Sequence, residues 1–350
     1  MSTDGPATRP LPGRMLRTPV GLTRERRYSL STLPDASPLP AVVEALAPGM
    51  SLKGWVADNQ ALIAETLGRA GGVLFRGFEV GSPEEFEGCV AALSGRLLEY
   101  TYRSTPRRKV SGNIYTSTEY PADRPIPLHN EMSYSRAWPM KLWFYAVTVA
   151  GQGGETPIAD SRKVLARIPA RVRDAFERRR VMYVRNYGAG MDLPWQDVFQ
   201  TGERADVEQM CRETGIEWEW LGRDELRTRQ ICQAVATHPI TGEAVWFNQA
   251  HLFHVSSHGP EVSELLLKQF SEAGLPRHAC YGDGAPIEAA ALTAIRDAFD
   301  QETVRFPWRP NDVLLLDNML AAHGRAPYAG ARRVLVGMAE ASSASTCVEM

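Results

Sequence analysis

The chain has 350 residues, and its 39 Lys and Arg nearly balance its 41 Asp and Glu, for a formal net charge of -2. This balance excludes a sequence-independent nucleic-acid binder, which needs a basic excess, and it leaves no polybasic patch for a membrane surface. The hydrophobic fraction of 44% is ordinary for a globular protein. The longest apolar run, 142–151, is the length of a strand, so no transmembrane helix is predicted.

The N-terminus has no apolar stretch of the kind found in signal peptides. The chain contains no CxxC motif, and its cysteines are scattered and odd in number: Cys89, Cys211, Cys232, Cys280 and Cys347. This pattern fits neither a disulfide scaffold nor a cysteine zinc site, so we expect a cytoplasmic protein.

Residues 1–40 hold 7 of the 24 prolines and are expected to form an irregular or partly extended arm. Residues 41–350 are expected to form a single domain with a helical insertion at about 187–230. Apolar spacing predicts helices at 41–47, 59–70, 83–94, 161–168, 170–179, 205–214, 260–273 and 288–300. Strands are predicted at 73–78, 111–116, 141–149, 181–186, 216–220, 231–237, 244–247, 303–306, 312–316 and 332–339. Short strands among helices, without regular βαβ alternation, indicate an α+β fold around an antiparallel barrel or jelly roll.

A first chemical signal is the triplet His129-Asn130-Glu131. In an extended segment, residues i and i+2 point to the same face, so the imidazole and the carboxylate would lie side by side. Such a triplet alone is weak evidence for a metal site, because it also occurs in solvated loops.

A second signal runs from Asp312 to Arg333, where an apolar strand leads into a turn and then to His323. Arg332 and Arg333 open the next apolar strand, and an arginine pair is costly there unless it meets an anion. One His-x-carboxylate plus a distant His is the composition of the facial triad of non-haem Fe(II) oxygenases. Between these segments, Gly153 and Gly154 permit a tight turn and Thr156 offers a hydroxyl, although on its own a plain turn before a Ser-capped helix explains this segment better.

Four segments together resemble the taurine dioxygenase family of Fe(II)/2-oxoglutarate oxygenases, and in particular its amino-acid hydroxylases of syringomycin and clavaminate type. They are HNE at 129–131, GGETPIADSR at 153–162, FNQAHLFH at 247–254 and DNMLAAHGRAPYAGARR at 317–333. The resemblance spans about residues 70–340, and it implies a double-stranded β-helix (jelly roll) with flanking helices.

The resemblance implies Fe(II) and dioxygen as cofactors and 2-oxoglutarate as co-substrate. His129, Glu131 and His323 match the family's catalytic metal ligands, and Thr156 matches the hydroxyl at the far carboxylate of 2-oxoglutarate. Arg333 matches the arginine that pairs with this carboxylate. Arg332 competes for that role, because the loop after His323 is a residue shorter than in the taurine dioxygenases.

The resemblance also implies a substrate: an amino acid, free or tethered to a peptidyl carrier protein, that is hydroxylated at an unactivated C–H in natural-product biosynthesis. Residues that are candidates for contacting it are Asn113, Tyr115, Thr118, Asn248 and His251. A ligand carboxylate at position 131 argues against a halogenase. Gly337 stands where the taurine enzymes carry a sulfonate-binding arginine, which disfavours a sulfonate.

Two alternatives remain open from the residues. The same site could perform desaturation, cyclisation or epoxidation instead of hydroxylation. A zinc-dependent hydrolase could use the same three ligands. His251, His254 and His258 have helical spacing but no carboxylate or cysteine beside them, so we expect them to pack in the wall of the fold.

Overall fold

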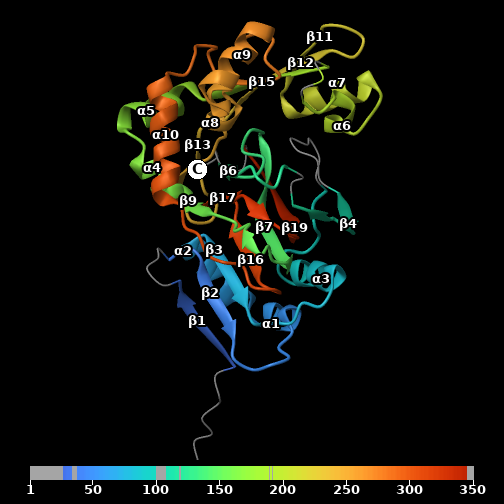
Figure 1. Cartoon of the computed structure of the whole chain (residues 1–350), viewed down its shortest axis with the longest axis vertical. Helices are drawn as coiled ribbons and strands as arrows, with labels where there is room; N and C mark the ends of the chain where they lie inside the picture. The colour runs from blue at the N-terminus through green and yellow to red at the C-terminus, as the bar shows by residue number, and fades with distance from the viewer. Residues whose placement is uncertain are drawn as a thin grey trace, which may run out of the picture.

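The computed structural model describes residues 27–33, 38–99, 108–117, 120–188, 190 and 192–344. Its largest sheet has eight strands, and Figure 1 shows them in the lower and central part of the molecule. Their order is β1 (Tyr28–Thr32), β2 (Ala41–Ala45), β3 (Gly72–Arg76), β16 (Val313–Asp317), β7 (Ala137–Thr148), β19 (Arg333–Ser343), β5 (Ile114–Thr116) and β4 (Lys109–Ser111). Neighbouring strands are antiparallel except β2 and β3, which are parallel.

A smaller sheet faces the large one and carries the chemistry-bearing segments. It consists of β6 (Ile126–His129), β17 (Ala321–Arg325) and β9 (Ile158–Asp160), with β8 (Gln152–Gly153) and β18 (Tyr328–Ala329) paired beside it. Ile158 and Ala321 from the small sheet share one buried cluster with Leu142 and Leu314 from the large sheet. Two sheets with side chains between them form the predicted jelly roll.

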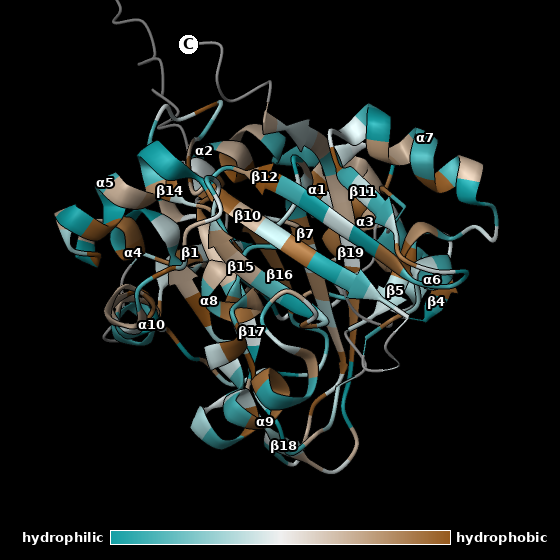
Figure 2. Cartoon of the chain, turned by 90° about the horizontal axis from the view of Figure 1, so that it is seen from above, coloured by the Kyte–Doolittle hydropathy of each residue, from teal (hydrophilic) through white to brown (hydrophobic). Residues whose placement is uncertain are grey.

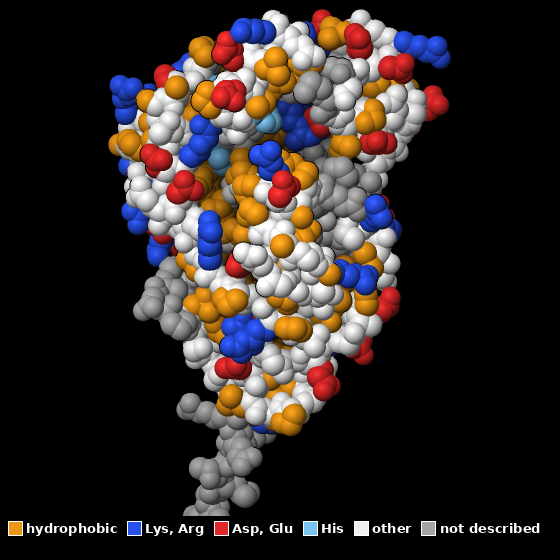
Figure 3. Space-filling view, viewed as in Figure 1, with side chains coloured by type: hydrophobic (Ala, Val, Ile, Leu, Met, Phe, Trp, Pro, Cys, Tyr) orange, Lys and Arg blue, Asp and Glu red, His pale blue; other side chains and the backbone are white. Residues whose placement is uncertain are grey.

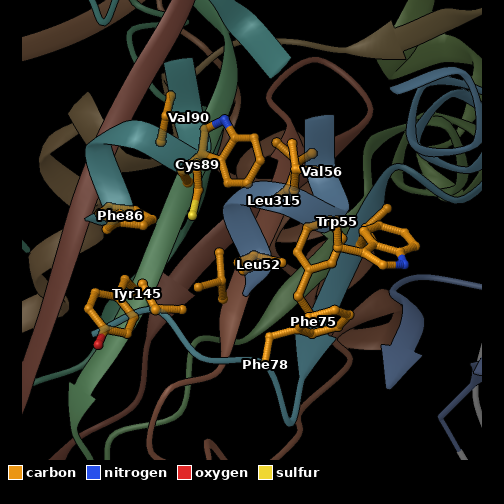
Figure 4. Packing of buried hydrophobic residues seen from close by; sticks show 14 of the residues in the cluster. Leu52, Trp55, Val56, Phe75, Phe78, Phe86, Cys89, Val90, Tyr145 and Leu315 are labelled. Carbon is orange, nitrogen blue, oxygen red and sulfur yellow. The ribbon is translucent and has the colours of Figure 1, made fainter. Parts of the chain in front are cut away.

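The outer face of the large sheet is covered by α1 (Leu52–Asp58) and α3 (Pro83–Ser94). Figure 4 shows Trp55 of α1 and Phe86 of α3 packed with Phe75, Tyr145 and other strand residues. Ser82 starts α3 by accepting a hydrogen bond from Glu85 N–H, and Pro83 fits its first turn. The central strands β3, β16 and β7 are therefore buried on both faces, which explains their nearly continuous apolar sequences.

A second sheet lies above the jelly roll in Figure 1, with order β11 (Glu217–Trp220), β12 (Leu226–Cys232), β10 (Val181–Tyr187) and β15 (Arg277–Tyr281). Helices and two short strands surround this sheet: α4 (Ser161–Arg167), α5 (Ala170–Arg179), α6 (Trp195–Phe199), α7 (Arg204–Thr214), β13 (Val235–Thr237), β14 (Ala244–Trp246), α8 (Ala250–Phe253), the 3-10 helix at 255–258, α9 (Pro260–Phe270) and α10 (Ala289–Glu302). Helix α2 (Gln60–Ala70) instead lies against β3 of the large sheet. Figure 2 shows that α5 and α7 are largely hydrophilic, as expected for helices on the outside. Within the part of the chain that the structure describes, no helix is long and apolar enough to cross a membrane.

Several predicted elements need correction. The helix predicted over 41–47 is wrong, because Ala41–Ala45 forms strand β2. Its β-branched Val42 and Val43 are buried between β1 and β3. The strand predicted over 303–306 is only an isolated bridge between Val304 and Ile158.

Within the predicted arm, the structure describes residues 28–32 as an edge strand of the large sheet. The strand predicted over 111–116 is divided by a turn into β4 and β5. Helix α7 and strand β11 lie within the predicted insertion at 187–230, close to their expected positions.

Candidate active site

Three candidate metal ligands meet where β6 and β17 pair. His129 is the last residue of β6, and it lies directly opposite His323 of β17 in the antiparallel register. Glu131 follows two residues after His129, outside the strand, and its side chain is buried. Residues almost 200 positions apart in sequence thus become neighbours through a single strand pairing.

The geometry of the three side chains suits one metal ion. His323 Nε2 lies 3.9 Å from Glu131 Oε2, and the rings of His129 and His323 have centroids 4.5 Å apart. One possible ligand atom from each residue can be chosen so that all three lie within 4.8 Å of one another. Among the described residues, this is the one such group of three or more His, Cys, Asp or Glu side chains.

The orientation of His129 is fixed by its backbone surroundings. Its Nδ1 lies 2.9 Å from the carbonyl oxygen of Pro127. In the tautomer that donates this hydrogen bond, Nε2 keeps its lone pair for a metal. Two neutral imidazoles and one carboxylate form the donor set of a facial triad, which leaves three coordination positions for other ligands.

A cavity with an empty volume of about 390 Å³ opens beside the two histidines. Its walls come from both sheets of the jelly roll: Ser117, Ile126, His129, Phe144, Thr156, His323, Gly324, Arg325, Arg332, Val334 and Val336. The outer surface is hollowed in the upper half of Figure 3, where histidine and Lys or Arg side chains are visible.

Arg332 provides a cationic group in this cavity. Its Nε donates to Gly154 O at 2.9 Å and its Nη1 to Ser117 Oγ at 3.3 Å. No carboxylate of the described residues lies within 4.0 Å of its guanidinium, and burial, together with the charge of Arg325, lowers the pKa of Arg332 to about 10. A charged group kept in such a place favours an anionic ligand.

The structure places the two adjacent arginines differently, although the sequence favoured Arg333 over Arg332. Arg333 is exposed and lies outside the cavity lining, whereas Arg332 lines the cavity together with Val334 and Val336. Within β19, the two-residue period puts Val334 and Val336 on the cavity side and Arg333 on the other side, while Arg332 lies just before the strand.

The alternation of side chains along β19 also shows that Gly337, which the sequence aligned with a sulfonate-binding arginine, faces away from the cavity. A Cβ atom at this glycine would meet Leu97, Ile114 and Val90, which lie on the helix-covered side of the sheet, away from the cavity. The residue four positions after Arg332 is Val336, which does line the cavity. The side chain at this position is apolar, or absent, in either alignment.

Thr156 lines the cavity, and Gly154 lies beside the Arg332 side chain. Thr156 is buried in the cavity wall, and its Oγ1 accepts a hydrogen bond from Trp308 Nε1 at 3.2 Å. Gly154 has φ +77°, and a Cβ there would lie 3.0 Å from Arg332 Cδ. This glycine therefore provides both the turn and the room for the arginine.

Arg325 is a cavity residue that the sequence analysis missed. It is buried, and its guanidinium donates to the carbonyl oxygens of Tyr120, Pro121 and Arg124. These bonds tie the turn before β6 to the strand that carries His323. Its position two residues after His323 is the signal that could have identified it, because residues i and i+2 of a strand share a face.

The candidate substrate contacts are placed unevenly. Asn113 donates to Leu97 O in the turn between β4 and β5, and Asn248 donates to Ala234 O and accepts from Ala250 N–H, so both amides hold backbone groups. Tyr115 is buried in the cluster between the two sheets. Thr118 lies outside the described residues. Neither Asn113, Tyr115 nor Asn248 lines a cavity beside the metal ligands.

His251 lines a second hollow with an empty volume of about 810 Å³, which shares Ile126 and Arg325 with the first cavity. Its ring stacks on Phe299 with centroids 4.7 Å apart, and its Nε2 lies 3.1 Å from Leu128 O. Burial lowers the pKa of His251 to about 3, so this imidazole is neutral at ordinary pH. It contributes to the wall next to β6, as expected for packing histidines.

Residues 35–339 match the family described as taurine catabolism dioxygenase TauD, TfdA family. The dapdiamide synthesis protein DdaC of Enterobacter agglomerans is 38% identical over 311 residues, covering 89% of this chain and 94% of that protein. A clavaminate synthase-like protein of Arabidopsis thaliana is 29% identical over 323 residues, covering 87% and 94%. The chain therefore belongs to the TauD/TfdA family, which confirms the resemblance.

Solved structures share the fold. PvcB of Pseudomonas aeruginosa superposes with a TM-score of 0.55 at 17% identity, over 90% of this chain and 92% of PvcB. A second PvcB structure is described as an Fe, alpha-ketoglutarate dependent oxygenase from an isonitrile synthetic pathway. A taurine dioxygenase from Burkholderia xenovorans gives 0.53 at 17% identity, over 89% of each chain. By its family, the chain is an oxygenase that uses iron and 2-oxoglutarate.

The buried neutral state of His251 predicts a loss of stability in acid. In the unfolded chain His251 takes up a proton near pH 6.5, whereas in the folded chain it does so only near pH 3. The unfolding free energy therefore has its full value above pH 6.5 and falls as the pH drops below 6.5, because protonation favours the unfolded chain. From His251 alone, we expect the unfolding free energy to be about 2 kcal/mol lower at pH 5 than at pH 7. Urea unfolding of the wild type and of His251→Gln at both pH values measures this, and an equal loss in the two proteins would contradict it.

Proposed function

We propose that this oxygenase hydroxylates an unactivated C–H of an amino acid, free or attached to a peptidyl carrier protein, in natural-product biosynthesis. The observation that carries the proposal is the convergence of two imidazoles and a buried carboxylate beside a cavity that the half-buried Arg332 lines. Overall, substrate, dioxygen and 2-oxoglutarate become hydroxylated substrate, succinate and carbon dioxide.

In this proposal, His129, Glu131 and His323 hold the iron, which when bound supplies the activation of dioxygen. The hydrogen bond from His129 Nδ1 to Pro127 O keeps the ring turned toward the metal. Phe144 packs against the His323 ring with centroids 5.1 Å apart, which limits the rotation of the second imidazole. The protein thus contributes ligand geometry and a largely apolar wall.

Arg332 binds the carboxylate of 2-oxoglutarate that lies away from the metal. Two of its N–H groups are directed by Gly154 O and Ser117 Oγ, so the guanidinium is held in place before the ligand arrives. The Thr156 hydroxyl, in the same wall, adds a second donor. The nearby Arg325 raises the cost of burying Arg332 without an anion, because like charges repel.

The substrate assignment is supported by the relatives. DdaC is named as a dapdiamide synthesis protein, and the Arabidopsis thaliana relative is named as clavaminate synthase-like. PvcB, a structural neighbour, is described as an enzyme of an isonitrile synthetic pathway. Val334 and Val336 give the cavity an apolar side on β19, which suits an aliphatic side chain better than a sulfonate.

The metal site gives the first prediction of the proposal. His129→Ala, Glu131→Ala and His323→Ala should each abolish the weak visible absorption band that Fe(II) and 2-oxoglutarate produce without oxygen, because each variant removes a ligand. The matched control is His258→Ala, since His258 is exposed and lies outside the group of three. A triad variant that retained the band and full turnover would contradict the assignment.

The two adjacent arginines form a second, internally controlled test. Arg332→Gln should weaken 2-oxoglutarate binding at least about 30-fold, because a buried charge partner of a carboxylate is worth about 2 kcal/mol or more. Arg333→Gln should leave it within about 3-fold, since this side chain is exposed. Anaerobic titration of the visible band with 2-oxoglutarate gives the dissociation constant for each variant. A larger loss of 2-oxoglutarate binding in Arg333→Gln than in Arg332→Gln would assign the carboxylate to Arg333.

The substrate class is tested by mass spectrometry. Free amino acids and carrier-bound aminoacyl thioesters are incubated with enzyme, Fe(II), ascorbate and 2-oxoglutarate. We expect a product 16 mass units heavier in step with succinate, because one oxygen atom is inserted. Product only from thioesters would establish the carrier requirement, whereas equal rates on the free acid would exclude it. Failure of every amino-acid substrate, with succinate formed from another compound class, would refute the amino-acid assignment.

A further inference from the structure

Asn318 is a completely buried amide in the turn between β16 and β17, five residues before His323. Its Oδ1 accepts a hydrogen bond from the backbone N–H of Glu131 at 2.7 Å. Its Nδ2 donates to the backbone oxygen of Glu131 at 2.9 Å and to that of Pro139 at 2.8 Å. One side chain therefore pairs with both backbone polar groups of the carboxylate residue.

This pairing occurs where the chain has left its strand. Strand β6 ends at His129, so Glu131 lies beyond the strand ladder that holds the neighbouring histidine. The next residue, Met132, has φ +57°, a conformation that a bulky L residue adopts only when its surroundings impose it. At this change of chain direction, the Asn318 amide makes the two backbone hydrogen bonds to Glu131 that a neighbouring strand would otherwise make.

The backbone of Asn318 is fixed as firmly as its side chain. Its N–H donates to Met140 O of β7 at 2.8 Å, and its carbonyl oxygen accepts from Asn130 Nδ2 at 2.7 Å. Asn130 in turn donates to Ser161 Oγ at 3.0 Å, and its own carbonyl oxygen accepts from Gln249 Nε2. The amide that contacts Glu131 thus belongs to a buried network anchored in both sheets of the jelly roll.

We propose that Asn318 is a positioning residue for the metal-binding carboxylate: it fixes the backbone of Glu131 so that the side chain reaches the site shared with His129 and His323. This inference rests on the proposed assignment of these three residues as metal ligands. A carboxylate ligand must lie within a few tenths of an ångström of its place, and rotation of its peptide would displace it by more. The hydrogen bonds from Asn318 to Glu131 go to its backbone atoms, so the effect of Asn318 passes through the backbone.

A purely structural asparagine would affect stability alone, so the test needs a readout of metal binding. We would titrate the metal-free full-length protein with Mn(II) in the absence of 2-oxoglutarate and follow free Mn(II) by EPR. The variants are Asn318→Ala and Asn318→Asp, the latter conserving the volume and the acceptor but losing the amide donor. Asn186→Ala is the matched control, because Asn186 is a buried amide that donates to two backbone oxygens and lies in the upper sheet.

Loss of an outer partner of a metal ligand commonly weakens metal binding 10- to 100-fold, and we expect a change of this size in both Asn318 variants. The Asn186→Ala protein should bind Mn(II) with an affinity within about 3-fold of wild type, even if its melting temperature falls as far as that of the Asn318 variants. Wild-type Mn(II) affinity in a folded Asn318 variant, confirmed by circular dichroism, would overturn the inference. Failure of the wild-type protein itself to bind Mn(II) would instead overturn the metal-site assignment.

Discussion

The register between β6 and β17 is the constraint on which the rest of the site depends. It places His323 opposite His129, and it brings the turn that holds Asn318 against the backbone of Glu131. A shift of one residue in this pairing would turn His323 to the other face of its strand. Gly324 supports the close pairing, since a Cβ there would lie 2.6 Å from Ile126 O.

The electrostatics of the cavity follow from the same two strands and their neighbours. Arg325 and Arg332 bring two cations into a wall that is otherwise mostly apolar, and their mutual repulsion adds to the cost of burial. Arg325 is stabilised by three backbone carbonyl oxygens, while Arg332 has two neutral partners. An anion beside Arg332 would offset this cost, which connects the stability of the cavity to the binding of its ligand.

Local sequence patterns predicted many of the helices and strands, because apolar spacing and caps are short-range signals. The Ser82 cap with Pro83 placed α3 correctly, and the apolar run at 313–316 placed β16. The prediction failed at Ala41–Ala45, where the pattern suits a short helix as well as a strand. Pairing with β1 and β3 decided that case, and such long-range pairing is not encoded in a five-residue window.

The sequence by itself determined the class of chemistry, because two histidines, a carboxylate, a threonine and an arginine pair occur in a recognisable order. Only the tertiary structure decided which arginine enters the cavity, since Arg333 begins β19 on the side away from the cavity and Arg332 lies just before the strand. It also decided the contacts of Arg325 and Asn318. Their partners lie about 180 to 205 residues away along the chain, so their contacts exist only once the two sheets have packed together.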